Sequence, residues 1–142
     1  MILNVTYPDY KTKAAMEKIV GKSYSLIDRI KMGGIGTSKL LMLEATDEIH
    51  KLLTITSDTT YCHLECRQGG LIIGFQTTMK IYVWLIPYHQ LTIYNNSGQL
   101  VIYGPKNNIK VKAPFNGTIN KKFIKKVLTI KAAYLEKFNF YP

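Results

Sequence analysis

Short apolar runs, separated by turn-forming residues, follow one another through most of the chain after residue 38. The separators include Gln68-Gly69-Gly70 and Gly104-Pro105-Lys106-Asn107-Asn108. Repeated short strands with such connections are typical of an antiparallel meander that is rolled into a sandwich or a barrel. We therefore expect strands at residues 40–44, 52–56, 61–67, 71–75, 81–86, 91–94, 100–103 and 109–113.

The clearest of these elements is a hairpin. Two apolar runs, residues 91–94 and 99–103, flank the connection Asn95-Asn96-Ser97-Gly98. Asn and Gly tolerate the positive φ angles that tight hairpin turns require. The pattern predicts that these two strands pair directly with each other.

The first 38 residues have a different pattern. Residues 2–7 predict a short strand that Pro8 ends. Asp9 predicts the cap of a helix that runs to Val20, and a second helix is expected at residues 25–32 before a glycine-rich joint. A chain of 142 residues fits one domain. We expect an N-terminal strand/helix segment (1–38) joined to a β-rich body (39–142).

A long amphipathic helix is expected at residues 120–138. On a helical wheel of about 100° per residue, large apolar side chains fall on one half and most charges on the other. The only charge within the apolar half is Lys131. The apolar half comprises Ile119, Phe123, Ile124, Val127, Leu128, Ile130, Tyr134, Leu135 and Phe138. This half is wide enough to cover the open side of a sheet, so the sequence predicts an α+β fold closed by this helix.

Net charge divides the chain unequally. The total is +10, yet residues 1–75 carry nine basic and eight acidic side chains, whereas residues 76–142 carry ten lysines and one acid. Such asymmetry attracts anionic partners, although a lysine-rich surface can also serve solubility alone. No signal peptide is visible, and no apolar run approaches the roughly 20 residues that span a bilayer. We therefore expect a cytoplasmic protein without a transmembrane segment.

The basic stretch of residues 106–131 is the leading candidate site. It has eight lysines and no acid, and four of them lie in the first turns of the last helix, where the macrodipole favours negative charge. A bound anion would relieve that arrangement, whereas the alternative is a solvated surface. The predicted anion-binding residues are Lys106, Lys110, Lys112, Lys121, Lys122, Lys125 and Lys126.

Other chemistry is weakly represented in the sequence. Cys62, His63 and Cys66 lie in an alternating strand pattern, which directs both cysteines to one face and His63 to the other. We interpret both cysteines as core residues and expect no metal. The glycines at 33, 34 and 36 lack the spacing of phosphate-binding motifs. No nucleophile elbow or paired acids are present, so we expect neither catalysis nor a cofactor.

The run Trp84-Leu85-Ile86-Pro87-Tyr88-His89-Gln90-Leu91-Thr92-Ile93 resembles a stretch of bacterial pleckstrin-homology-like (PH-like) domains, in which "Ile-Pro-Tyr, two residues, Leu/Ile" links two strands. As in those domains, a hairpin, one more strand and a closing helix follow. The resemblance covers residues 52–138. It implies a PH-like barrel and a non-enzymatic interaction module, which binds proteins, peptides or phosphorylated head groups through loops and a basic face.

Two alternatives remain open. A helix-grip fold also has one strand, two short helices, a run of strands and a long last helix, and it would imply a carrier of a hydrophobic small ligand. Nucleic-acid binding ranks third, because only Arg29 and Arg67 supply guanidinium groups and few aromatic residues suggest a stacking platform. The sequence does not determine the oligomeric state or the partner.

Overall fold

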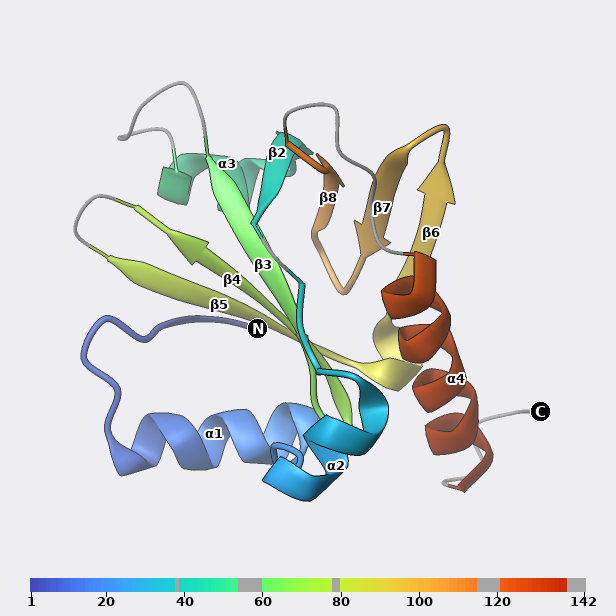
Figure 1. Ribbon diagram of the computed structural model, residues 1–142. Coiled ribbons are helices and arrows are strands. Elements are labelled where there is room, and N and C mark those ends of the chain that lie inside the picture. Colours follow the sequence, from blue (N-terminus) through green and yellow to red (C-terminus); the bar gives the residue numbers. More distant parts are fainter. Residues whose placement is uncertain (38, 54–59, 78–79, 115–120, 138–142) are drawn as a thin grey trace.

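The computed structural model describes residues 1–37, 39–53, 60–77, 80–114 and 121–137, which form an α+β fold (Figure 1). The described strands make one antiparallel sheet in the order β1-β5-β4-β3-β2-β8-β7-β6. Their bounds are β1 Ile2–Asn4, β2 Leu40–Ala45, β3 Tyr61–Cys66, β4 Gly70–Gln76, β5 Ile81–Pro87, β6 Thr92–Asn96, β7 Gln99–Tyr103 and β8 Asn108–Lys112. The helices are α1 Tyr10–Val20, α2 Leu26–Met32, α3 Asp47–Leu53 and α4 Lys121–Lys137, with a 3₁₀ turn η1 at Tyr88–Gln90.

The seven strands from β2 to β8 form a meander that turns back on itself. β2 pairs with β3 on one side and with β8 on the other, so the first strand of the meander lies beside the last. Its register shifts between Met42 and Glu44, and such a bulge bends a strand. Figure 1 accordingly shows the two halves of the sheet, β3–β5 and β6–β8, running in different directions. No pairing between described strands joins β6 to β5 or β1, so the sheet is open and the predicted barrel is not confirmed.

Both faces of the β4–β5 region are covered. The main core lies on the side of α3 and α4, where Phe123 and Val127 of α4 pack with sheet residues such as Leu64 and Ile102. A second cluster lies on the opposite face beneath α1, where Val20 packs against Ile72, Val83 and Leu85 of the sheet. Because it is covered on both sides, β4 is buried from Gly70 to Phe75. This double coverage matches the uninterrupted apolar run in its sequence.

Local sequence signals locate the N-terminal helices correctly. The Asp9 carboxylate accepts a hydrogen bond from the Thr12 N–H (2.8 Å) and caps α1, which ends at Gly21. Ser25 caps α2 in the same way, and Gly33 follows that helix with a φ of 72°. Both helices therefore begin and end where Ser, Asp and Gly favour a boundary.

The prediction of a strand at residues 52–56 is wrong at residues 52 and 53. Leu52 and Leu53 form the end of α3, and residues 54–56 lie outside the described residues. Two acids, Asp47 and Glu48, occupy the first turn, where they complement the helix dipole. Ile49 and Leu53, four residues apart, both reach the core. The buried positions of this segment therefore follow the three-to-four-residue period of a helix and not the two-residue alternation of a strand.

The predicted C-terminal helix and its inward apolar face are confirmed over Lys121–Lys137. Phe123, Ile124 and Val127 are buried, and Ile130 and Tyr134 pack at the margin of the core. Leu128 differs, because 45% of it is exposed. The expected positions Ile119 and Phe138 lie outside the described residues.

The predicted hairpin is confirmed as β6 and β7, with a tighter connection than expected. Asn96 pairs with Gln99, so the turn consists of Ser97 and Gly98 alone. Both residues have positive φ angles, 53° and 85°, which are typical of a two-residue hairpin turn.

In the part of the chain that the structure describes, no helix has the length and apolar character needed to cross a membrane.

Candidate functional site

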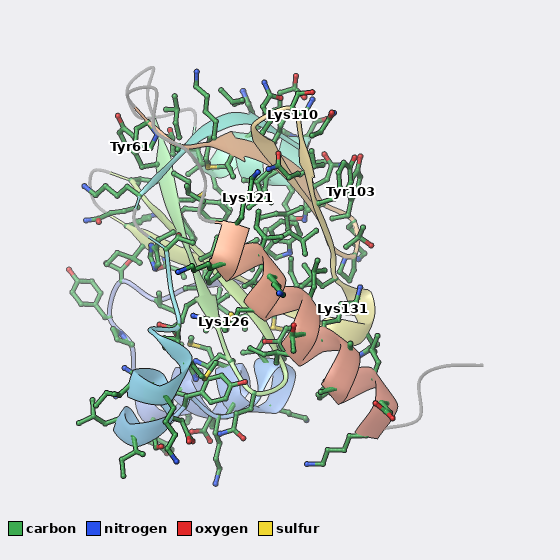
Figure 2. The ribbon with its side chains drawn as sticks, turned by 45° about the vertical axis from the view of Figure 1, so that its right-hand side comes forward. Tyr61, Tyr103, Lys110, Lys121, Lys126 and Lys131 are labelled. Carbon is green, nitrogen blue, oxygen red and sulfur yellow. The ribbon has the colours of Figure 1, made fainter. Side chains whose placement is uncertain are left out.

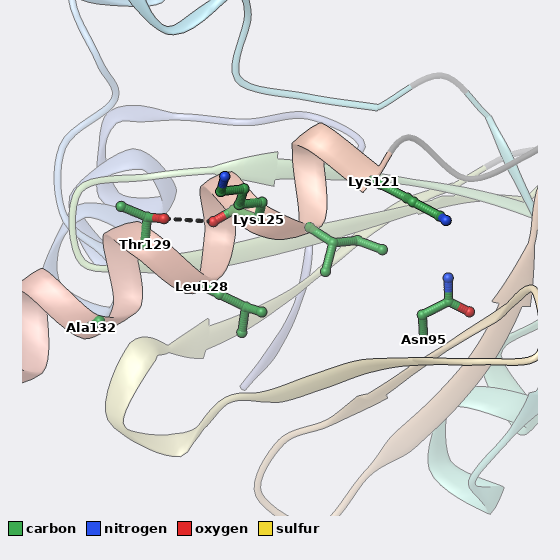
Figure 3. Close-up of a pocket in the computed structure, with 7 residues that line it drawn as sticks. Asn95, Lys121, Lys125, Leu128, Thr129 and Ala132 are labelled. Atoms are coloured by element: carbon green, nitrogen blue, oxygen red, sulfur yellow. Dashed lines mark hydrogen bonds between the residues drawn. The ribbon is translucent and has the colours of Figure 1, made fainter.

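A groove runs between α4 and the edge strand β6 (Figure 3). It has a volume of about 660 Å³ and is open to solvent. Its lining is apolar at Ile124, Leu128 and Ala132, which lie along one side of α4. The groove residues are completed by Lys121, Lys125 and Thr129 of α4 and by Asn95 of β6.

Strand β6 borders this groove with an unpaired edge. It is the last strand in the sheet order and pairs only with β7 among the described strands. In an antiparallel ladder, residues that exchange hydrogen bonds alternate with residues that do not. Since Asn96 and Gln99 close the tight turn, Tyr94 also bonds to β7, whereas the N–H and C=O groups of Ile93 and Asn95 face the free edge. The groove therefore offers backbone donors and acceptors along one wall.

Positive charge lines the other wall. Lys121 and Lys125 are exposed, and Figure 3 shows the Lys121 side chain extending towards the Asn95 amide across the groove. Further along α4, the Lys131 ammonium donates to the Leu91 carbonyl just before β6. Partial burial lowers the pKa of Lys131. None of the groove residues is acidic, so an anionic group would meet cations without competing carboxylates.

The structure does not gather the predicted lysines on one surface (Figure 2). Lys121 and Lys125 border the groove, whereas Lys126 lies on another flank of α4 and donates to the Gly34 carbonyl (2.8 Å). Lys122 lies on the exposed side of the first turn of α4.

The remaining predicted lysines belong to the sheet and its loops. Lys110 and Lys112 flank the buried Val111 on β8, so they point away from the core, and the Lys110 ammonium lies 3.5 Å from a Glu44 carboxylate oxygen. Lys106 lies in the turn before β8 with a φ of 66°. Lys121 and Lys125 are therefore the predicted site residues that the groove brings together.

The cysteines occupy the core, as the alternation of β3 predicts. Cys62 and Cys66 are buried and free, whereas His63 faces the opposite side and its ring covers Gly74 of β4. Among the described residues, no cluster of His, Cys, Asp or Glu side chains has the arrangement needed to hold a metal ion.

These buried thiols are expected to make the fold sensitive to alkaline pH. Burial raises the pKa of Cys62 and Cys66 to about 12, whereas a thiol in an unfolded chain ionises near about 8.5. Each thiol therefore keeps its proton to a higher pH in the folded state than in the unfolded state. The contribution of this difference to stability is fully present below about pH 8.5 and is lost as the pH rises towards 12. Urea unfolding with a reducing agent should give a steadily lower free energy of unfolding above about pH 8.5.

A Cys62→Ala/Cys66→Ala variant provides the control for this pH dependence. Its free energy of unfolding should fall less steeply than that of the wild type between about pH 8.5 and 9, where tyrosine, with a pKa of about 10, is still largely protonated. Identical pH profiles would mean that the thiols do not cause the loss.

The sequence interpretation missed two components of the groove. It assigned Leu128 to the core, and it did not identify the edge of β6 or Asn95 as a potential binding element. The helical wheel places Leu128 near the apolar face but does not show where that face meets solvent.

Comparisons with family models, curated proteins and solved structures give no match to this chain.

Proposed function

We propose that this chain is a non-enzymatic, cytoplasmic interaction module of PH-like type, and that it binds an extended acidic peptide between β6 and α4. The observation that carries the proposal is the groove itself. There the edge of β6, which has no second partner strand among the described residues, faces an apolar helix surface bordered by Lys121 and Lys125. The anionic partner expected from the charge distribution is thereby narrowed to a peptide or an extended protein segment.

Strand order supports the PH-like part of the proposal. The first strand of the meander, β2, lies beside the last, β8, and the meander is interrupted only between β5 and β6. The 3₁₀ turn η1 crosses this gap, and α4 packs against both η1 and β6. A rolled meander with a C-terminal helix over its open side is the arrangement that the resemblance implies. The resembling run from Trp84 to Ile93 includes the β5–η1–β6 connection.

Recognition would combine backbone and side-chain contacts. A peptide that adds a strand to β6 would bond to the free N–H and C=O groups of Ile93 and Asn95, which provides affinity without sequence preference. Alternate side chains of such a strand point to the same side. Apolar side chains would contact Ile124, Leu128 and Ala132, and acidic side chains would contact Lys121 and Lys125.

The composition of the groove also supports a binding role over catalysis. Its ionisable groups are lysines, with no carboxylate, imidazole or thiol beside them to act as a second acid or base. The alternative, a helix-grip carrier of a hydrophobic ligand, receives less support. Trp84, Phe75 and Tyr88 are fully buried with α4 residues in one packed cluster, and the apolar lining of the groove is open to solvent.

Charge reversal in the groove tests the proposal. The probe is a fluorescein-labelled peptide of four Glu-Val repeats, titrated with the full chain and followed by fluorescence anisotropy. Lys121→Glu/Lys125→Glu should weaken binding about tenfold or more, because two favourable contacts to carboxylates become repulsive. Lys11→Glu/Lys13→Glu is the matched control, since it makes the same change in net charge on exposed α1 positions away from the groove.

A second measurement examines the strand edge. Backbone N-methylation of alternate residues in the probe peptide should weaken binding when the methylated amides face β6, because each methyl group removes a hydrogen-bond donor. No binding of the probe, or equal weakening by both charge-reversal variants, would contradict the proposal. Equal weakening would indicate that the probe peptide is held by long-range attraction to the net positive charge of the protein and not by contacts within the groove.

A further inference from the structure

Helix α2 exposes an apolar surface that no described part of the chain covers. Leu26, Ile27 and Ile30 are exposed by 74%, 65% and 72%, and no residue of the helix is buried. Large aliphatic side chains that are exposed singly are common on proteins, but a contiguous group of them indicates an interaction surface. The sequence analysis predicted a short helix at residues 25–32 but assigned no function to it.

Cations border this apolar surface on both sides. At about 100° per residue, Leu26, Ile30 and Ile27 span an arc of about 100° on the helix. Arg29 lies about 60° before that arc, and Lys31 lies about 40° beyond it. The acid of this helix, Asp28, is about 100° or more from every apolar member of the arc. The exposed surface is thus apolar at its centre and basic at its margins.

The structure fixes the orientation of this helix at both ends. Before it, Tyr24 packs against the main core, and Ser25 caps the first turn. After it, the Gly34 carbonyl accepts a hydrogen bond from the Lys126 ammonium, and the buried Ile35 accepts one from the Cys66 N–H (2.7 Å). The apolar side chains therefore point outwards because the flanking residues are anchored to α4 and β3.

The size of the surface favours a membrane over a protein partner. Three aliphatic side chains expose on the order of a few hundred Å², less than the roughly 800 Å² that each partner buries in a stable protein complex. A lipid interface requires no complementary shape. An apolar helix face with Lys or Arg at its margins is typical of helices that lie in the head-group region of anionic membranes.

We propose that α2 docks this protein onto the surface of an anionic membrane. Leu26, Ile27 and Ile30 enter the boundary between head groups and acyl chains, while Arg29 and Lys31 contact lipid phosphates. The docking surface is separate from the groove, which lies on the side of α4 that faces β6. The two sites can therefore be tested independently.

Co-sedimentation of the full chain with vesicles tests this proposal. The wild type should bind vesicles of phosphatidylcholine with phosphatidylglycerol more strongly than vesicles of phosphatidylcholine alone. Leu26→Ser/Ile27→Ser/Ile30→Ser should bind the anionic vesicles at least about tenfold more weakly, and Arg29→Gln/Lys31→Gln should reduce binding by about tenfold. The matched control, Tyr7→Ser/Tyr10→Ser, removes two other exposed apolar side chains and should bind like the wild type.

A fluorescent variant reports insertion directly. Trp84 is buried, so in an Ile27→Trp variant the change on adding vesicles comes from position 27, and its emission should shift to the blue. Absence of wild-type binding to anionic vesicles, unchanged binding of the triple serine variant, or an unshifted emission would each overturn the proposal. Concentration-dependent dimerisation that the triple variant abolishes, without vesicle binding, would instead identify a surface for a second copy.

Discussion

Replacing Trp84 by alanine is expected to lower the free energy of unfolding by about 3–5 kcal/mol. Trp84 is fully buried on β5, between Ile2 of β1 and Ile73 of β4. Its ring extends to the backbone of Gly104, after β7, so one side chain fills the space between the two halves of the sheet. Its Nε1 atom has no hydrogen-bond partner among the described residues, so truncation removes apolar contacts and leaves no bonding partner behind.

Urea unfolding of the Trp84→Ala variant measures this loss, which is a large part of the 5–15 kcal/mol typical of a domain. Ile81→Ala is the control on the same strand. Ile81 is 37% exposed, so its truncation should cost less than about 1 kcal/mol. A loss of similar size in both variants would mean that the two halves of the sheet do not pack around Trp84.

Local chemistry made much of the fold predictable. Asp9 caps the helix that it was expected to cap, and a second helix lies where residues 25–32 predicted one. The alternation of Cys62, Leu64 and Cys66 correctly separates the buried face of β3 from the exposed one. Such signals act within a few residues, and they identify an element because its hydrogen bonds and its apolar face are local properties.

Long-range arrangement could not be predicted in the same way. β1 pairs with β5, about 80 residues away, and no periodicity in either strand specifies that partner. Residues 52 and 53 were assigned to a strand because a short apolar run is compatible with both periods. Their helical state depends on Ile49 and Leu53 reaching one core together, which the apolar run alone does not reveal.

The candidate site illustrates the same limit. The lysines of residues 106–126 form one group in the sequence, yet Lys110 and Lys112 point outwards from β8 while Lys121 and Lys125 border the groove. Side chains alternate between the two faces of a strand, whereas they repeat every 3.6 residues around a helix. The lysines of β8 and those of α4 therefore point to different surfaces. The free edge of β6 follows from strand order, so no residue pattern indicated it.

Introducing an acid at Val127 is expected to have the second large effect. Val127 is fully buried on the inner face of α4, within the same cluster as Phe123 and Ile124. The Val127→Asp substitution would bury a carboxylate without a partner for its charge. Such changes typically lower the free energy of unfolding by about 4 kcal/mol or more. Urea or thermal unfolding should therefore reveal a severely destabilised protein or one without a cooperative transition.

The adjacent residue provides the control. Leu128 is 45% exposed in the groove, so Leu128→Asp should change the free energy of unfolding by less than about 1 kcal/mol. The added negative charge should nevertheless weaken binding of the acidic probe peptide.

Acid should partly restore the Val127→Asp variant. Burial raises the pKa of a carboxyl group, so the penalty is present above the unfolded value of about 3.9 and diminishes as the pH falls and the group is protonated. The difference in stability from the wild type should therefore be smaller near about pH 4 than at pH 7. Equal destabilisation by Val127→Asp and Leu128→Asp at both pH values would mean that α4 does not seal the sheet with the Phe123–Val127 face, and the groove built on that packing would be lost with it.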